Sequence, residues 1–513
     1  MIGQASLLTD GTRFADPQGR HVLLHGINVV NKDPGAGYFF DEGPALYTRL
    51  RSWGFNVVRL GVIWDGLEPE PGVYDEAYLG RLDRQIAWAK AHDLFVFLDM
   101  HQDLYSALYA DGAPEWATLT DGAPHVDLGG VWSDAYFTSP AVQRALDNFW
   151  DNAPAADGVG IQDHYARAWA HLARRYAGEP TVLGYDIMNE PFPGSAAVEV
   201  QGLMFARGAE LIGARGGAFD GVMASVGTHD SAVEALSEQW LTPEGRSAIL
   251  QLLCDIDLYT EVIDATETLY RDFEMTHLMA MYGRVARAIR ASGDRHALFL
   301  ETTMGSNMGV FSAIEPLVLD GKRDPAQVYA PHGYDLVVDT GDIAEPCPER
   351  VELIFRRHGE TAQRLGMPML VGEWGAYGRH PGTLPAAWHV VRQFETLLCG
   401  ETYWTYAPGV EHFPCFQAIH RPYPERVAGM LHHYRYDPDR GVLEVTWRED
   451  GTVVAPSRVY LPDWFIRDGI RTRVTPPGHG SSMTEEGDGA SGRYLEIPPA
   501  GEACTRHLVV SRE

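Results

Sequence analysis

The most constraining feature of this sequence is an alternation between short apolar runs and amphipathic stretches with helical spacing, which continues through its first two thirds. Eight of the apolar runs have the length and composition of buried strands. They cover residues 21–28, 56–62, 94–99, 181–188, 296–301, 327–332, 368–372 and 401–406. Eight strands with helices between them predict an α/β fold of the (β/α)8 barrel type, also called a TIM barrel.

An open, doubly wound sheet is the alternative to a barrel. It would place a glycine-rich dinucleotide turn after the first strand, and His25-Gly26-Ile27-Asn28 is not such a turn.

Two long segments interrupt the alternation of predicted strands and helices. Residues 102–157 read as an irregular stretch rich in Gly, Pro and Trp, which predicts a functional loop. Residues 199–290 are mostly helical in pattern and too long for one crossover, which predicts an inserted helical subdomain.

The spacing of apolar residues changes after about residue 430, and no helical spacing is found beyond it. Residues 432–449 read as strand, turn and strand, and 453–461, 471–475 and 494–498 read as further strands. This pattern predicts a small β-sandwich, with a flexible loop at 478–492. We therefore expect a barrel over 1–428, with its helical insertion at about 199–290, and a C-terminal β-sandwich over 429–513.

Charge and composition narrow the classes of partner. The net charge is −29, and no cluster of Lys and Arg suits a nucleic-acid backbone. No apolar run approaches the roughly 20 residues that span a bilayer, so we expect no stable membrane insertion. The first ten residues do not resemble a signal peptide, which leaves a cytoplasmic protein or a secreted one whose leader was removed.

The cysteines and histidines show no metal-ligand spacing. The five Cys contain no C-x-x-C pair, and of the possible disulfides only a bridge such as Cys399–Cys415 stays open. His296 and His420 stand apart from other ligand types. We expect no metal, no cofactor and a monomeric chain.

Polar residues follow the predicted strands at the edge where a (β/α)8 barrel carries its catalytic groups. Two of them, Glu190 and Glu373, are glutamates that directly follow apolar runs. Retaining glycosidases use two carboxyl groups about 5–5.5 Å apart, one protonated and one ionised. His332, Tyr334 and Arg59 could hold one glutamate as a carboxylate, while burial raises the pKa of the other.

These residues resemble glycoside hydrolase family 5. The resemblance covers roughly residues 22–406, and eight positions follow the order of that family: Arg59, His101, Asn189, Glu190, His332, Tyr334, Glu373 and Trp404. A narrower resemblance is to its endoglycoceramidase branch. It rests on Lys32-Asp33, on the run from Asp99 to Asp103 followed by Tyr105-Ser106, on 421–424 (Arg-Pro-Tyr-Pro), and on the C-terminal β-sandwich.

The resemblance implies a role for each position. Glu190 would be the general acid/base and Glu373 the nucleophile. Arg59 and Tyr334 would fix the nucleophile, and Asn189 would bind the sugar 2-hydroxyl. The remaining expected site residues are His101 and His332 as catalytic support, Trp404 as the platform beneath the sugar, and Lys32 and Asp103 as partners of its hydroxyls. Glu301, which ends the fifth strand, receives no role.

The implied activity is that of a retaining endo-β-glycosidase that cuts between an oligosaccharide, or a single sugar, and ceramide. Its partner would be a glycolipid met transiently at a membrane surface or micelle. Residues 248–254, or the helical face of Met275, Leu278, Met279 and Tyr282, could form an apolar cleft for the lipid, or could pack against the barrel. The alternatives are a family 5 β-glucanase, mannanase or steryl-glucosidase, and an inactive sugar- or lipid-binding protein, which would lack one carboxylate.

Overall fold

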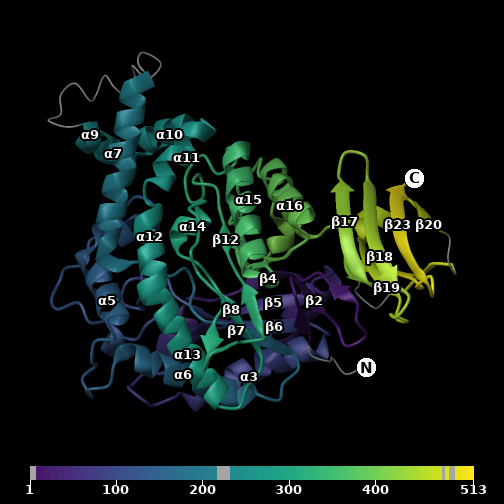
Figure 1. Ribbon diagram of the computed structural model, residues 1–513, viewed down its shortest axis with the longest axis horizontal. Helices are drawn as coiled ribbons and strands as arrows, with labels where there is room; N and C mark the ends of the chain where they lie inside the picture. Colours follow the sequence, from purple (N-terminus) through teal and green to yellow (C-terminus); the bar gives the residue numbers. More distant parts are fainter. Residues whose placement is uncertain (1–6, 216–231, 477–479, 485–490) are drawn as a thin grey trace.

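The computed structural model describes residues 7–215, 232–476, 480–484 and 491–513. Eight parallel strands form the centre of the larger part of the molecule, in the spatial order β11-β8-β7-β6-β5-β4-β15-β13, and a bridge between Tyr329 and Met369 joins the two ends (Figure 1). The strands are β4 (His25–Val29), β5 (Val57–Ile63), β6 (Phe95–His101), β7 (Val182–Asp186), β8 (Ala297–Leu300), β11 (Gln327–Tyr329), β13 (Leu370–Val371) and β15 (Gly400–Tyr403). The predicted (β/α)8 barrel is confirmed.

Two short strands prolong the sixth and seventh barrel strands. β12 (His332–Gly333) and β14 (Glu373–Trp374) pair in parallel, which places Glu373 opposite His332. Gly372 precedes β14, and a Cβ atom there would lie 2.8 Å from Nε2 of His332. A glycine is required at this position because only a residue without a side chain leaves room for the imidazole.

Helices cover the outside of the barrel. They include α1 (Pro44–Ser52), α3 (Glu76–Ala91), α6 (Ile161–Tyr176), α13 (Met279–Ala291), α15 (Pro348–Leu365) and α16 (Leu384–Leu397). Helix α3 begins at Asp75, whose carboxylate accepts the backbone N–H groups of Ala77 and Tyr78, as expected of an N-cap. Helix α15 ends at Gly366 with φ +59°, the left-handed conformation typical of a helix C-terminus.

The first interruption, residues 102–157, is more ordered than the sequence predicts. It contains α4 (Ala135–Thr138) and α5 (Pro140–Trp150), so the expectation of an irregular stretch is wrong for this part. Helix α5 buries Val142, Leu146 and Phe149 in the barrel core. The Gly- and Pro-rich segment before the helix hid its apolar spacing.

The second interruption lies between β7 and β8 and extends to the upper left of Figure 1. Its described helices are α7 (Ala197–Arg215), α9 (Ala232–Trp240), α10 (Pro243–Leu252), α11 (Ile256–Asp264) and α12 (Glu267–Phe273), and residues 274–278 form a π-helical turn before α13. The predicted insertion also includes residues 216–231, which are outside the described residues.

One of the two apolar stretches in this region does not form a cleft. Leu278 and Tyr282 are fully buried in the barrel core, where α13 packs against α6. Met275 is 42% exposed. Of the two interpretations of this helical face, packing against the barrel is therefore the correct one, because the barrel itself must cover the apolar side of its helices.

The smaller part of the molecule is a β-sandwich, on the right of Figure 1. Its sheets have the orders β1-β2-β3-β16-β19-β22-β21 and β17-β18-β23-β20, and they share one core around Trp447, Val459 and Leu508. The strands are β1 (Leu8–Asp10), β2 (Arg13–Ala15), β3 (His21–Val22), β16 (Tyr423–Val427), β17 (Met430–Asp437), β18 (Val442–Asp450), β19 (Ser457–Pro462), β20 (Ile470–Thr475), β21 (Ser482–Met483), β22 (Gly492–Ile497) and β23 (Ala503–Arg512).

The N-terminal strands join this sandwich. The run at 21–28, predicted as one strand, divides into β3, which pairs with β16, and β4, which enters the barrel. The sequence could not show this pairing because the two segments lie 400 residues apart. The division of the chain at residue 428 stays a prediction, and the predicted loop at 478–492 is largely outside the described residues.

Helix α16 connects the two parts of the molecule, because its Trp388 packs against both cores. Cys399 and Cys415, the pair left open as a disulfide, are separate buried thiols. Within the described ranges, no helix combines the length and apolar character that crossing a membrane requires.

Candidate active site

A pocket of about 270 Å³ opens at the carboxyl ends of the barrel strands. Eight of the ten predicted site residues line it: Lys32, His101, Asp103, Asn189, Glu190, Tyr334, Glu373 and Trp404. The other two, Arg59 and His332, are fully buried side chains in contact with these residues. The structure thus brings all ten together.

Glu373 is held through both carboxylate oxygens. Nη1 of Arg59 donates to Oε1 at 2.6 Å, and the hydroxyl of Tyr334 donates to Oε2 at 2.9 Å. Burial and the nearby carboxylates keep the pKa of Tyr334 well above its usual range, so this phenol remains a donor. One oxygen thus faces a cation and the other a hydroxyl, an arrangement that fixes the orientation of a nucleophilic carboxylate.

Glu190 receives both of its side-chain hydrogen bonds on the same oxygen. Nδ2 of Asn307 lies 2.9 Å from Oε1, and Nδ1 of His332 lies 3.0 Å from it. The backbone of Glu190 has φ +42°, a left-handed conformation that is uncommon for a residue with a side chain. Because Oε1 is occupied, Oε2 is the oxygen left to carry a proton to a ligand.

The two carboxylates are close together. Oxygens of Glu190 and Glu373 and a ring nitrogen of His332 all lie within 4.8 Å of one another. Retaining glycosidases hold their two carboxyl groups about 5–5.5 Å apart, whereas inverting enzymes leave roughly 6.5–9.5 Å for a water molecule. The separation at this site is of the retaining kind.

The environment of Glu373 shifts the pKa of its carboxyl group. Burial raises the pKa of Glu373 to about 7, aided by the Glu190 and Glu301 carboxylates and opposed by His332 and Arg59. The sequence suggested that His332, Tyr334 and Arg59 could hold one of the two glutamates as a carboxylate. At Glu373 these groups do not keep the pKa at its usual value, because the effect of burial outweighs that of His332 and Arg59.

Arg59 is the centre of a network of buried acids. Its guanidinium lies 2.9 Å from Asp99, 2.9 Å from Asp186 and 2.7 Å from Glu301, in addition to its contact with Glu373. Burial raises the pKa of Asp99 to about 6 and that of Asp186 well above its usual range. The cluster therefore retains protons at pH values where exposed carboxyl groups have lost them.

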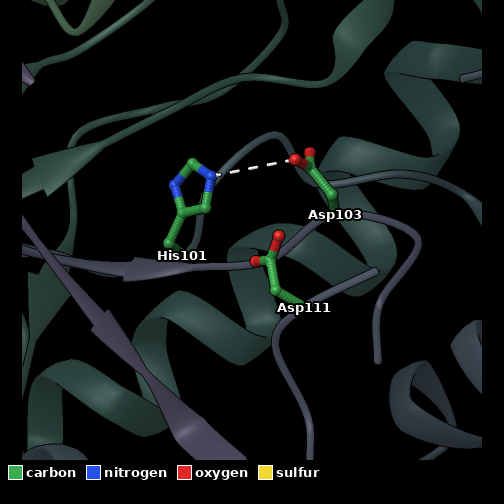
Figure 2. Close-up of side chains that lie close together, drawn as sticks. All are labelled: His101, Asp103 and Asp111. Carbon is green, nitrogen blue, oxygen red and sulfur yellow. Dashed lines mark ion pairs between the residues drawn. The ribbon is translucent and has the colours of Figure 1, made fainter. Parts of the chain in front are cut away.

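A second polar cluster forms the side wall of the pocket. Figure 2 shows His101 and Asp103 turned toward one another above Asp111, with Nε2 of His101 3.9 Å from Asp103. Nδ1 of His101 lies 2.8 Å from Asp99. Burial and Lys32 hold the pKa of His101 well below its usual range. The neutral ring therefore donates from Nδ1 and leaves Nε2 free to accept a hydroxyl group.

Lys32 supplies the positive charge of this wall. Its ammonium forms an ion pair with Asp103 and lies 3.7 Å from Asp111. His101, Asp103 and Asp111 are close enough to hold a metal ion, but Lys32 already balances their charge. The other two such groups among the described residues contain Glu373 and Asp186, which contact Arg59. The expectation that no metal is needed stays a prediction.

Aromatic rings form the floor and rim of the pocket. Trp404 stacks on His101 with ring centroids 5.0 Å apart and planes 12° apart, and Nζ of Lys32 lies 4.8 Å from the Trp404 centroid. Trp132 is 41% exposed and faces the same ammonium at 5.9 Å. Flat rings beside charged and hydrogen-bonding groups suit a sugar, which has apolar faces and polar edges.

An apolar cavity of about 110 Å³ adjoins the pocket, and Phe137, Trp240, Met308 and Leu336 line both. Apart from Gln201 and Gly208, every residue that lines the cavity is hydrophobic. The remaining lining residues are Met204, Phe205, Ile212, Leu236, Ile249, Leu252, Leu253, Leu258 and Val262. The stretch at 248–254 thus contributes to a cleft, whereas the face of Met275 and Leu278 does not.

Sequence reasoning missed several residues of the site. Asn307 contacts Glu190 from the end of the short helix α14 (Met304–Asn307), and Asp111 lies beside Lys32 in a loop. Both are several residues beyond the strand ends that were searched. Glu301 was noticed at the end of a strand and received no role. Its position directly after an apolar run was the available signal, because a buried acid there requires partners.

Comparison with known proteins identifies one relative over nearly the whole chain and another over part of it. Residues 16–216 and 256–409 match the family model described as cellulase (glycosyl hydrolase family 5), and residues 421–493 match the glycoside hydrolase family 5 C-terminal domain. Endoglycoceramidase I of Rhodococcus hoagii (strain 103S) is 38% identical over 521 residues, which cover 97% of this chain and 89% of that protein. A glucosylceramidase of Aspergillus fumigatus is 30% identical over 259 residues, 39% of this chain and 34% of that protein.

Solved structures share the fold. Endo-glycoceramidase II from Rhodococcus sp., in a cellobiose-like imidazole complex, superposes with a TM-score of 0.71 at 24% identity, over 97% of this chain and 99% of that one. Cryptococcus neoformans sterylglucosidase 1 superposes with a TM-score of 0.70 at 15% identity, over 100% of this chain and 97% of that one. The barrel and the sandwich are therefore found together in both of these structures.

Proposed function

Because the chain belongs to glycosyl hydrolase family 5 and to its endoglycoceramidase branch, we propose that it hydrolyses the β-glycosidic bond between a glycan and ceramide. The reaction retains the configuration of the sugar, with Glu373 as nucleophile and Glu190 as general acid/base. The observation that carries this proposal is the approach of their carboxylate oxygens to within 4.8 Å.

The first step transfers the glycan to the protein. Oε2 of Glu373 is held by Tyr334 and Oε1 by Arg59, and one of these oxygens attacks the anomeric carbon while the glycosidic C–O bond breaks. Oε2 of Glu190 donates its proton to the departing oxygen of ceramide. The products of this step are free ceramide and a glycosyl ester of Glu373.

The second step returns the free carboxylate. Glu190, now ionised, accepts a proton from water, and the resulting hydroxide oxygen attacks the anomeric carbon. The ester bond to Glu373 breaks, and the glycan leaves with its original configuration. His332 contacts both carboxylates, at 3.0 Å to Glu190 and 3.6 Å to Glu373, so it can stabilise whichever is ionised.

The polar wall binds the sugar in this proposal. Lys32 and Asp103 hold hydroxyl groups at the pocket surface, and His101 accepts another through Nε2. Asn189 uses its oxygen for Arg59 at 2.9 Å and one N–H for Gln102 at 3.0 Å, which leaves one N–H for the 2-hydroxyl. Trp404 supports the apolar face of the ring.

The apolar cavity favours a lipid aglycone over a polysaccharide. It begins where the leaving group would depart, because Met308 and Leu336 belong to both spaces. A glucan or mannan would place hydroxyl-rich sugars there, and their desolvation would be unfavourable in a cavity without matching polar groups. Hydrocarbon chains gain roughly 25 cal/mol for each Å² of apolar surface removed from water.

The lipid assignment is tested by comparing the hydrolysis of a fluorescent ganglioside with that of carboxymethylcellulose. Two substitutions on helix α7 are then compared with each other. Phe205→Asp places a charge in the cavity lining, whereas Leu203→Asp places it on a 36% exposed residue of the same helix that is outside the cavity lining. We expect Phe205→Asp to raise KM for the ganglioside more than 10-fold, with Leu203→Asp close to wild type. Activity on the polysaccharide alone, or equal effects of both variants, would contradict the lipid assignment.

A further inference from the structure

Glu301 is a buried glutamate at the end of β8 whose carboxylate contacts three groups of the catalytic machinery. Oε1 lies 2.7 Å from Nη2 of Arg59 and 3.2 Å from Nε2 of His332. Oε2 accepts the backbone N–H of Glu190 at 2.8 Å. We propose that Glu301 is the positioning residue of the general acid/base, an inference that rests on the roles proposed above for Glu190 and Glu373.

Only a carboxylate satisfies this environment. All three neighbours present hydrogens, and an ionised carboxylate offers acceptors at both oxygens and no donor. A glutamine would direct its NH2 group either at the Glu190 N–H or at Arg59 and His332. The first orientation sets the NH2 group against one donor and the second sets it against two, in a site that is 1% exposed, where water cannot relieve the conflict.

The bond to the Glu190 backbone restrains an unfavourable conformation. The left-handed region is unfavourable for a residue with a side chain, and Glu190 has φ +42°. Glu301 is the acceptor recorded for this N–H in the described part of the chain. Loss of that acceptor would allow the backbone to relax and would move the carboxyl group away from Asn307 and from the leaving group.

The contact between Glu301 and His332 affects the side chain of Glu190, because His332 contacts both carboxylates. The pKa of this imidazole stands well above its usual range because Glu301, Glu373 and Glu190 outweigh its burial. The ring thus remains an imidazolium that faces Glu301 with Nε2 and Glu190 with Nδ1. Arg59 is the other cation of this cluster. The backbone carbonyl of His332 is held by His358.

The position of the proposed nucleophile, Glu373, depends less on Glu301 than the position of Glu190 does. Without Glu301, Arg59 would still contact Asp99 and Asp186 at 2.9 Å each, and Glu373 would keep its bond from Tyr334. The acid/base would lose its backbone restraint and the anion that supports its imidazolium. Removal of Glu301 should therefore impair proton donation to the leaving group more than attack on the anomeric carbon.

The difference between impaired proton donation and impaired attack can be measured by varying how strongly the leaving group requires a proton. Glu301→Gln is assayed for kcat/KM, which reports the first step, on a series of aryl β-glycosides from dinitrophenol to unsubstituted phenol, and on a glycolipid. Dinitrophenolate departs without a proton, whereas an alcohol requires one. We expect a loss of about 100-fold for the glycolipid and less than about 10-fold for the dinitrophenyl glycoside, with KM nearly unchanged.

The matched control is Glu425→Gln. Glu425 lies in β16, is fully buried and forms ion pairs with Arg51, Arg426 and Arg458, away from the site. This control should show no dependence on the leaving group. A loss in Glu301→Gln that is equal across the series, or no loss, would overturn the inference.

Two further measurements separate folding and substrate identity from this role. Should Glu301→Gln not fold, Glu301→Asp keeps the charge but is one methylene too short to reach all three neighbours, and it should show the same trend with a smaller loss. A flat series for Glu301→Asp would also overturn the inference. If the wild type cleaves aryl glycosides but no glycolipid, the proposed substrate is wrong, and the aryl series still decides the role of Glu301.

Discussion

Replacement of Glu373 by glutamine should abolish turnover and, at the same time, stabilise the folded protein in a pH-dependent manner. The catalytic loss follows because an amide cannot form the glycosyl ester. The gain in stability follows because the pKa of Glu373 rises from 4.5 to about 7 on folding, through burial and the neighbouring acids. The folded state therefore ionises this group less readily than the unfolded chain does.

The sign and size of the effect follow from linkage. Below pH 4 both states carry the proton, and Glu373 contributes nothing to the pH dependence. As the pH rises from 4.5 to 7, the unfolded chain loses its proton first, and the folded state becomes less stable. A pKa unit corresponds to 1.36 kcal/mol, so the destabilisation above pH 7 is about 3 kcal/mol. Glu373→Gln should remove it.

The assay is urea unfolding followed by tryptophan fluorescence at pH 4 and pH 8. The free energy of unfolding of Glu373→Gln relative to wild type should increase by about 3 kcal/mol between these pH values. Glu395→Gln is the control, since burial also raises the pKa of Glu395 to about 7 and it lies on α16, where it accepts the N–H of Tyr436. It should show a similar gain and keep full activity. A relative stability of Glu373→Gln that is the same at both pH values would refute the reasoning.

Three further substitutions test individual contacts. Tyr334→Phe removes a 2.9 Å hydrogen bond to the Glu373 carboxylate. Because hydrogen bonds to charged groups contribute about 1.5–3 kcal/mol, kcat/KM should fall roughly 10- to 100-fold. A change below twofold would contradict the assigned contact. Asn307→Ala removes a donor from Oε1 of Glu190 and should lower kcat roughly 10-fold in steady-state assays, with KM within twofold of wild type. An effect on KM alone would assign Asn307 to substrate binding instead. Lys32→Met leaves Asp103 and Asp111 without their cation and should raise KM for the glycolipid at least about 10-fold, and an unchanged KM would exclude Lys32 from the sugar site.

The barrel and its principal residues could be predicted because each depends on local sequence. A buried parallel strand reads as a continuous apolar run, and the residue that follows it is at the carboxyl edge of the sheet. Glu190 and Glu373 follow such runs at β7 and β13, and the barrel brings the two edges together. The residue types and their order were sufficient without any knowledge of distances.

Contacts between distant segments could not be predicted in this way. Asn307 reaches Glu190 across 117 positions, from the helix α14, which is too short to give a periodic signal in the sequence. The N-terminal strands pair with β16 about 400 residues later. The pKa of Glu373 depends on its burial and on the charged groups around it, which only the folded structure reveals. Each of these features is set by tertiary packing rather than by neighbouring residues.

The excess of buried acid around Arg59 is better explained by catalysis than by stability. Arg59 contacts Asp99, Asp186, Glu301 and Glu373, so one guanidinium serves four carboxyl groups. A cluster built for stability would match charges, because unpaired buried charge is unfavourable. Here burial, aided by the Glu190 and Glu301 carboxylates, raises the pKa of Glu373 to about 7. In the proposed mechanism Glu373 is the nucleophile, and a more basic carboxylate is the stronger nucleophile once it is ionised. Arg59 and Tyr334 then fix its direction, so the stability lost at this site yields a reactive group in a defined position.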